Sequence, residues 1–103
     1  MAFGIATRVK ESVLRVEPTA RIILYGSRAR NDFQKESDWD FLILVDGDVD
    51  YKRTARIRHE LHELEWETGE VLCAIVRSRA LWGAPEFQAS SLFANIRAEG
   101  ITV

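Results

Sequence analysis

The chain has 103 residues, of which 47% are hydrophobic and 29% charged, a composition typical of a folded domain and not of a disordered segment. This length suffices for one domain and is too short for two, so we expect a single domain over residues 1–103. The net charge of −2 excludes bulk electrostatic attraction to duplex nucleic acid, and any anionic ligand must therefore be held by local charges. A domain of this size buries a modest share of its surface, so a partner subunit would stabilise it.

The cysteine content and the apolar runs indicate the cellular compartment. The single cysteine, Cys73, allows no intrachain disulfide, which favours a reducing compartment. No apolar run reaches the length needed to span a bilayer. The first five residues lack the basic region and apolar core of a signal peptide. We therefore expect a cytoplasmic protein without a membrane partner.

The first half of the chain predicts two helices and two strands. Apolar residues at spacings of three and four predict an amphipathic helix over about 2–16, which ends before Pro18. The β-branched run Arg21–Tyr25 predicts an internal strand. A Gly-Ser turn follows, and a short helix is expected over 27–30. A second strand is expected over 38–45.

The second half predicts one long helix, one strand and a less regular C-terminal part. The pattern is helical over 50–68, and Gly69 stands where a helix C-cap is expected. The nearly apolar stretch 70–76 predicts a third strand. A turn of helix is expected over 80–82 and a weaker helix over 87–98. Strands that alternate with helices predict an α/β (α+β) fold with helices packed against a small sheet.

Two carboxylates, Asp38 and Asp40, are separated by one residue at the start of the second predicted strand. Strand side chains alternate between faces, so both aspartates point to one side and Trp39 points to the other, where it packs on a helix. Two like charges this close oppose each other's ionisation unless a cation lies between them. Mg²⁺ binds through one or two carboxylates together with substrate phosphates, so this pair predicts a magnesium site.

The segment that precedes the aspartates predicts a phosphate site. Gly26 lets the backbone come close to a ligand. The Ser27 hydroxyl and the amides of the following helical turn can bind phosphate oxygens. Arg28 and Arg30 can neutralise a triphosphate, since arginine suits bidentate phosphate contacts. Together with the aspartates, this segment predicts a site for a nucleoside triphosphate whose phosphates are bridged to the protein by metal.

Each half of this arrangement also has a common structural explanation. A Gly-Ser pair after a strand is frequent, and an Asp-x-Asp pattern usually marks a solvated turn or a strand edge. The two patterns occur together here, with two arginines between them and a predicted strand on either side. Their combination favours a functional site.

The runs Gly26–Arg30 and Ser37–Asp40 resemble the signature of the minimal nucleotidyltransferases (MNT-type), a branch of the polymerase-β-like superfamily. The family pattern is Gly-Ser-x-Ala-Arg-Gly, a spacer, and Ser-Asp-x-Asp before apolar residues. The resemblance implies a small mixed β-sheet flanked by helices. It also implies transfer of a nucleoside monophosphate from a nucleoside triphosphate, with ATP as the expected donor, to a hydroxyl acceptor. By the same resemblance, Asp38 and Asp40 are the catalytic Mg²⁺ ligands, and the nucleotide-binding residues are Gly26, Ser27, Arg28, Arg30 and Ser37.

Two positions depart from the family pattern. Asn31 stands where glycine is usual, and asparagine also adopts left-handed backbone geometry. Active members carry a third carboxylate, often the general base, on the next strand, and here that position falls at or near Ala74. Glu70 at the strand entry could replace it only in a different register, because a shift of one residue moves a side chain to the opposite face. A catalytically idle nucleotide-binding or antitoxin module is therefore the alternative to the enzyme.

The resemblance also implies a partner. Small domains of this family often pair with a helical HEPN-type protein in a toxin–antitoxin module, in which the nucleotidyltransferase is the antitoxin. We therefore expect a nucleoside triphosphate and a HEPN-type protein as partners. A free-standing enzyme that modifies a small hydroxyl compound is a less favoured alternative for so short a chain, and a homo-oligomer stays open.

Other residues have simpler interpretations. His59, His62 and Glu63 fall on a charged helix face without a further ligand motif, so solvated surface is favoured over a metal cluster. Cys73 lies in an apolar run and is expected to be a small buried hydrophobe. Four large aromatic residues are expected either in the core or in a surface for a protein partner: Trp66, Trp82, Phe87 and Phe93.

Overall fold

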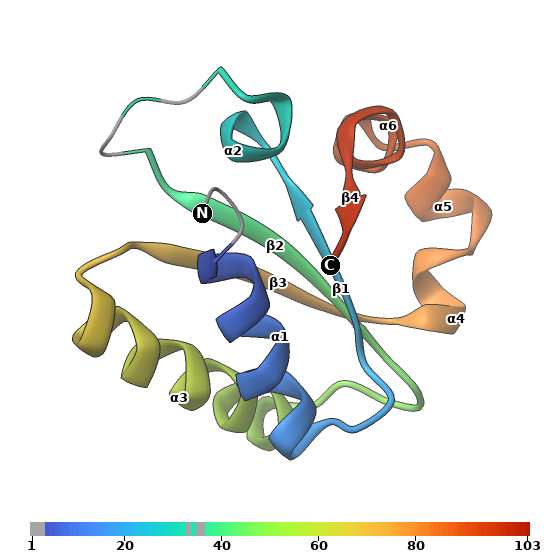
Figure 1. The fold of residues 1–103 in the computed structure, drawn as a ribbon. Helices are drawn as coiled ribbons and strands as arrows, with labels where there is room; N and C mark the ends of the chain where they lie inside the picture. The colour runs from blue at the N-terminus through green and yellow to red at the C-terminus, as the bar shows by residue number, and fades with distance from the viewer. Residues whose placement is uncertain (1–3, 33, 35–36) are drawn as a thin grey trace.

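The structure is a computed structural model that describes residues 4–32, 34 and 37–103. Six helices and four strands are assigned within these residues (Figure 1). In chain order they are α1 (Gly4–Val16), β1 (Arg21–Tyr25), α2 (Ser27–Arg30), β2 (Trp39–Val45), α3 (Tyr51–Thr68), β3 (Leu72–Ser78), α4 (Arg79–Trp82), α5 (Pro85–Gln88), α6 (Ser91–Glu99) and β4 (Ile101–Thr102).

The strands form one mixed sheet in the order β3-β2-β1-β4. Strand β1 pairs antiparallel with β2 and with β4, whereas β2 and β3 run parallel. The register places Tyr25, the last residue of β1, opposite Asp40 near the start of β2. The end of β1 and the start of β2 therefore lie at the same end of the sheet, next to α2 (Figure 1). The predicted small mixed sheet with flanking helices is confirmed.

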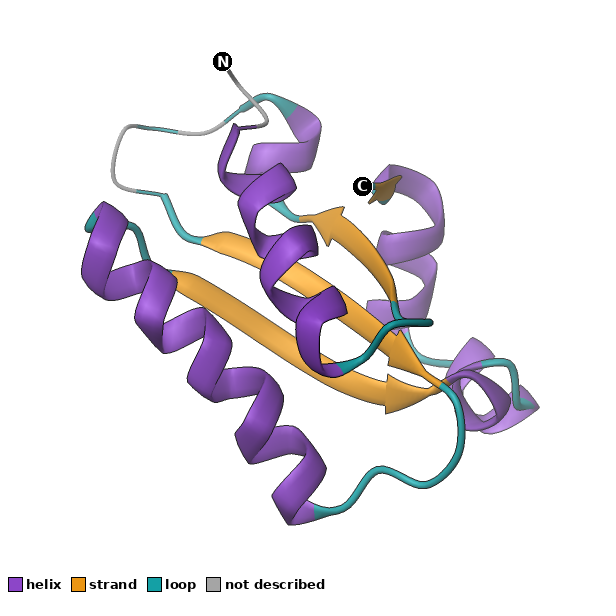
Figure 2. Ribbon diagram, turned by 60° about the horizontal axis from the view of Figure 1, so that its bottom comes forward, coloured by secondary structure: helices purple, strands orange, loops and turns teal. Residues whose placement is uncertain are grey.

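Helices cover both faces of the sheet. Figure 2 shows α1 and α3 on one face and α6 on the other. Trp39, Phe41 and Ile43 of β2 belong to the core on the α1/α3 side, whereas Leu42 and Leu44 pack with Ile96 of α6. This alternation follows from the two-residue period of a strand. It confirms that Trp39 packs on the helical layer, and it assigns Asp40 to the α6 side.

Local signals explain where α3 begins and ends. The Asp50 carboxylate accepts a 2.8 Å hydrogen bond from the backbone N–H of Arg53, as an N-cap residue does. At the other end Gly69 has φ 74° and donates its N–H to the carbonyl of Glu65. Positive φ is accessible to glycine without steric cost, so the helix stops there.

The C-terminal part differs from the sequence prediction. The helix predicted over 87–98 is two helices, α5 and α6, because the Ser90 hydroxyl accepts the backbone N–H of Phe93 and begins a new helix. Strand β3 begins and ends two residues later than predicted. The short strand β4 was not predicted at all. The first residues of the helix predicted from position 2 lie outside the described part of the chain.

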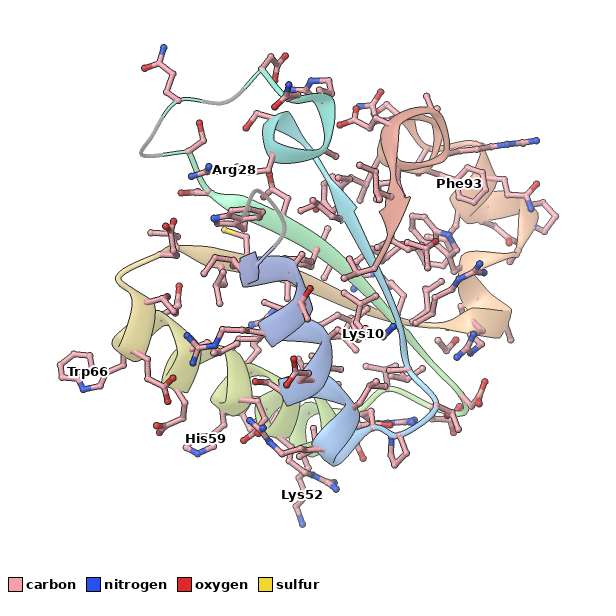
Figure 3. All side chains as sticks on the ribbon, in the orientation of Figure 1. Lys10, Arg28, Lys52, His59, Trp66 and Phe93 are labelled. Atoms are coloured by element: carbon pink, nitrogen blue, oxygen red, sulfur yellow. The ribbon has the colours of Figure 1, made fainter. Side chains whose placement is uncertain are left out.

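The aromatic residues divide between the two sides of the molecule. Trp66 of α3 is 91% exposed and points away from the sheet (Figure 3). Trp82 instead packs with Phe87 and Phe93, at ring-centroid distances of 6.3 and 5.1 Å. The four aromatic residues therefore do not form one surface. None of the described helices has both the length and the apolar character needed to cross a bilayer.

Candidate functional site

The turn after β1 is packed directly against one of the two aspartates. Gly26 has φ 79° and ψ −162°, a region open essentially to glycine alone. A Cβ atom at this position would collide with Oδ2 of Asp40. The glycine is therefore required both for the backbone angle and for the close approach. The contact joins the predicted phosphate loop, which is the turn at Gly26 with α2 (Ser27–Arg30), to the predicted metal site at Asp38 and Asp40.

Helix α2 is a single turn stabilised by its own backbone. The carbonyl of Gly26 accepts the N–H groups of Ala29 and Arg30 at 3.0 and 3.1 Å. The carbonyl of Ser27, the first residue of α2, accepts the N–H of Asp32 at 3.1 Å. Asn31 ends the helix at φ 62°, which confirms that asparagine takes the left-handed geometry here. Ser27 is half-buried, next to Gly26.

The two aspartates differ in their surroundings. Asp38 comes just before β2 and is exposed, whereas Asp40 lies within β2 and is half-buried. Burial raises the pKa of Asp40, the charge of Asp38 raises it further, and Arg30 opposes the rise. A bound cation would favour the ionised form and reverse this effect. A cation between Asp38 and Asp40 would therefore stabilise the two ionised carboxylates, which otherwise repel each other.

The residues at this site fit Mg²⁺ when a substrate supplies the remaining ligands. The described residues contain no group of three or more His, Cys, Asp or Glu side chains that could hold a metal ion. Mg²⁺ does not require such a cage, because it keeps several waters and commonly binds through one or two carboxylates and substrate phosphates. Asp38 and Asp40 are the residues that would hold it.

The predicted histidine alternative has no further support. His59 lies 3.8 Å from Glu63, and both side chains are well exposed on α3. Together with the absence of a metal-ligand group among the described residues, this favours the interpretation as solvated surface.

Arg28 connects α2 to the segment that enters β2 (Figure 3). Its side chain is 8% exposed, and its guanidinium lies over the Trp39 ring, 4.5 Å from the ring centroid. Its Nε and Nη2 donate to the carbonyl of Ser37 at 3.3 and 3.0 Å, and Nη2 lies 3.8 Å from Glu70. Ser37 also accepts the backbone N–H of Gln34 through its hydroxyl. These polar groups thus take part in hydrogen bonds within the protein. They belong to Arg28 and Ser37, which are both predicted nucleotide-binding residues.

Arg30 takes a different position, between Asp32 and Glu99. Its side chain is 46% exposed, its Nε donates to Asp32 at 3.1 Å, and its Nη1 donates to Glu99 at 2.8 Å. The same Glu99 oxygen accepts the backbone N–H of Gly26 at 2.7 Å. Glu99 is therefore part of the site, although it lies at the end of α6, in a weakly periodic stretch far along the chain. The sequence offers no signal at this residue that would have identified it.

The strand next to the aspartates presents Cys73 to them. Cys73 pairs with Asp40 in the parallel register, and its sulfur lies 3.7 Å from Oδ2 of Asp38. Ala74 packs on the α1/α3 side instead. The residue of β3 beside the aspartates is thus Cys73, one position before Ala74, where the family pattern predicted it. The expectation that Cys73 is buried was wrong, because the residue is exposed. Glu70 does not face the aspartates, since it accepts the indole N–H of Trp39 at 3.2 Å on the opposite side.

The chemistry around Cys73 is acidic. Although Cys73 is exposed, the protein atoms around its sulfur remove part of its hydration and raise the pKa of the thiol, and the charges of Asp38 and Asp40 raise it further. A neutral thiol is a poor proton acceptor, so Cys73 does not provide the base that a third carboxylate would supply.

Comparisons with known proteins give a family match, a relative and a similar fold. Residues 6–94 match the family described as nucleotidyltransferase domain. A stretch of 62 residues, 60% of this chain, is 42% identical to a Methanocaldococcus jannaschii protein named as a candidate protein adenylyltransferase, and spans 57% of that protein's length. A solved toxin–antitoxin structure with AMP-PNP has a TM-score of 0.65 and 15% identity, and the match covers 93% of this chain and 69% of that one. At this identity the likeness shows the fold alone.

Proposed function

Because the chain belongs to the nucleotidyltransferase domain family, we propose that it is a Mg²⁺-dependent enzyme that transfers a nucleoside monophosphate from ATP to a hydroxyl acceptor and releases pyrophosphate. The family match confirms the resemblance to the polymerase-β-like minimal nucleotidyltransferases. The cation, the donor nucleotide and the acceptor are parts of the proposal.

The contact between Gly26 and Asp40 carries this proposal. It brings the phosphate loop to the carboxylates, so phosphates bound near Ser27 and Arg30 would lie beside a metal held by Asp38 and Asp40. When bound, Mg²⁺ neutralises charge on the phosphates and on the leaving pyrophosphate. The protein's own contribution is to orient the triphosphate and to hold the two carboxylates on one face of the sheet.

We further propose that the acceptor is a protein. The named adenylyltransferase relative and the toxin–antitoxin structural neighbour support this step. A helical HEPN-type toxin is the proposed partner, with this chain as its antitoxin in the cytoplasm. A hydroxyl-bearing side chain of that partner would then receive the nucleotide.

The test uses ATP labelled at the α-phosphate, Mg²⁺ and the candidate partner protein. We expect label transfer to the partner by the native chain and none by the double variant Asp38→Asn/Asp40→Asn. The matched control is Asp46→Asn/Asp48→Asn, which removes a second Asp-x-Asp pair just after β2, and it should keep transfer. Nucleotide binding by the native chain without any transfer would contradict the proposed activity.

One observation favours the alternative that the chain binds nucleotide but does not catalyse its transfer. Cys73 occupies the place beside Asp38 where active family members are expected to carry a carboxylate. If the native chain binds nucleotide without transferring it, Cys73→Asp should create transfer, because it supplies a proton acceptor beside the metal. Cys73→Asn is the matched control for size, and it should remain inactive. Transfer by the native chain would eliminate the idle alternative.

A further inference from the structure

One oxygen of Glu99 joins two groups of the phosphate loop. Its Oε2 accepts the backbone N–H of Gly26 at 2.7 Å and the Nη1 of Arg30 at 2.8 Å. The Glu99 side chain is only 17% exposed. A single side-chain oxygen therefore holds both donors, the backbone amide of Gly26 and the guanidinium of Arg30.

The first donor, the Gly26 amide, belongs to the turn that precedes α2. Gly26 adopts the mirror image of an extended conformation, which glycine takes readily, and the large conformational freedom of glycine means that contacts must hold the turn in place. Its N–H would lack a hydrogen-bond partner if the carboxylate were removed, and an unpaired donor in a partly buried turn is unfavourable. Glu99 therefore stabilises the turn that presents Ser27 and α2.

Arg30 is fixed from two sides by carboxylates. Asp32 binds its Nε at 3.1 Å, while Glu99 binds its Nη1. A guanidinium has five N–H groups, so these two contacts leave further donors of this partly exposed side chain for a ligand. A side chain already held in its binding geometry loses less conformational entropy when a phosphate arrives.

The carboxylate also has an electrostatic cost. Glu99 is among the charges that raise the pKa of Asp40, so it opposes the ionised form of a proposed metal ligand. A negative charge here gives no attraction to an anionic nucleotide. Its two hydrogen bonds are therefore the contribution that the geometry assigns to Glu99.

We propose that Glu99 is a positioning residue for the nucleotide, which organises the phosphate loop from the C-terminal helix α6. This inference rests on the proposed function, since it concerns the same nucleotide site. It predicts that nucleotide affinity depends on the reach of the Glu99 side chain, and that its charge matters little.

The test compares three substitutions of Glu99 by titration calorimetry with AMP-PNP and Mg²⁺. Glu99→Gln keeps the length and an acceptor oxygen, and should bind within about threefold of the native chain. Glu99→Asp keeps the charge but is one methylene shorter, and Glu99→Ala removes the group, so both should weaken binding at least about tenfold, which is about 1.4 kcal/mol. Glu86→Ala removes an exposed acid from α5 and should change nothing.

A second measurement reports on the contact itself without nucleotide. Hydrogen exchange at the Gly26 amide should be faster in Glu99→Asp and Glu99→Ala than in the native chain, and unchanged in Glu99→Gln. Circular dichroism of each variant checks that the fold is retained.

The outcomes separate this inference from the proposed function. If the native chain and Glu99→Ala bind AMP-PNP equally, the positioning role is wrong while nucleotide binding stands. If Glu99→Ala binds AMP-PNP more tightly than the native chain, with or without the same effect in Glu99→Gln, the carboxylate competes with the phosphates. That result also overturns the positioning role. Absence of binding by the native chain contradicts the proposed function, and the positioning role fails with it.

Discussion

At the scale of single residues, Gly26 is constrained in two ways. Its backbone angle and the adjacent Asp40 carboxylate both exclude a side chain. Gly69 offers a comparison, since it also has positive φ, at 74°, but a Cβ there would meet no atom within 4 Å. Its ψ of 4° places it in the left-handed region that other residues can adopt, whereas Gly26, at ψ −162°, is in a region open essentially to glycine, so both the backbone angle and the contact make a side chain more costly at Gly26.

We expect Gly69→Ala to lower the free energy of unfolding by about 1 kcal/mol through backbone strain alone. Gly26→Ala should cost more, up to about 3 kcal/mol, and should also weaken Mg²⁺–nucleotide binding, because the loop must move away from Asp40. Chemical denaturation and nucleotide titration of both variants check this prediction. Equal losses of stability and unchanged binding in Gly26→Ala would contradict the role of the contact.

At the scale of elements, a partly buried ion pair joins the end of α1 to the start of α3. Arg53 donates through Nε and Nη2 to the two carboxylate oxygens of Glu17, both at 2.7 Å, and through Nη1 to the carbonyl of Asp48. Glu17 is 8% exposed. Two short parallel bonds of this kind fix the relative position of the helices that cover one face of the sheet.

Arg53→Met should lower the free energy of unfolding by about 2 kcal/mol, because it leaves the Glu17 carboxylate buried and unpaired. Arg15→Met is the control, since the Arg15–Glu60 pair joins the same two helices but its arginine is 65% exposed. That change should cost no more than about 0.5 kcal/mol. Urea denaturation at neutral pH measures both values, and equal losses would contradict the prediction.

The same pair predicts a pH dependence of stability. The hydrogen bonds from Arg53 lower the pKa of Glu17 below its ordinary value of 4.5. A carboxyl group whose pKa is lower in the folded state stabilises the fold at pH above its unfolded value and loses this effect as the pH falls through its folded pKa. Below pH 4.5 the native chain should therefore lose stability more steeply than Arg53→Met, as denaturation curves across this range would show. Parallel losses in both would disprove the assignment to Glu17.

The secondary structure was largely predictable because its signals are local. The runs at β1 and β2 and the period of α3 are properties of neighbouring residues, and caps such as Asp50 and Gly69 mark where α3 begins and ends. The split between α5 and α6 also had a local signal, the Ser90 cap, which the apolar spacing over 87–98 obscured. Strand β4 is only two residues long, too short for any periodicity.

At the scale of the whole molecule, the candidate site was predicted only where its residues are close in the sequence. The turn at Gly26 and the pair Asp38 and Asp40 come from one segment, so their association could be anticipated. Cys73 faces the aspartates because of the register between β2 and β3, and a shift of one residue would move it to the opposite face. The contact of Glu99 with the loop depends on the packing of α6, which no local pattern encodes.

The hydrogen bond between Gly26 and Glu99 joins residues 73 positions apart. Because a domain generally folds as a unit, the turn at Gly26 acquires this anchor only once α6 has docked on the sheet. Local unfolding of α6 would therefore release the Gly26 amide, so the hydrogen bond couples the stability of this helix to the conformation of the turn.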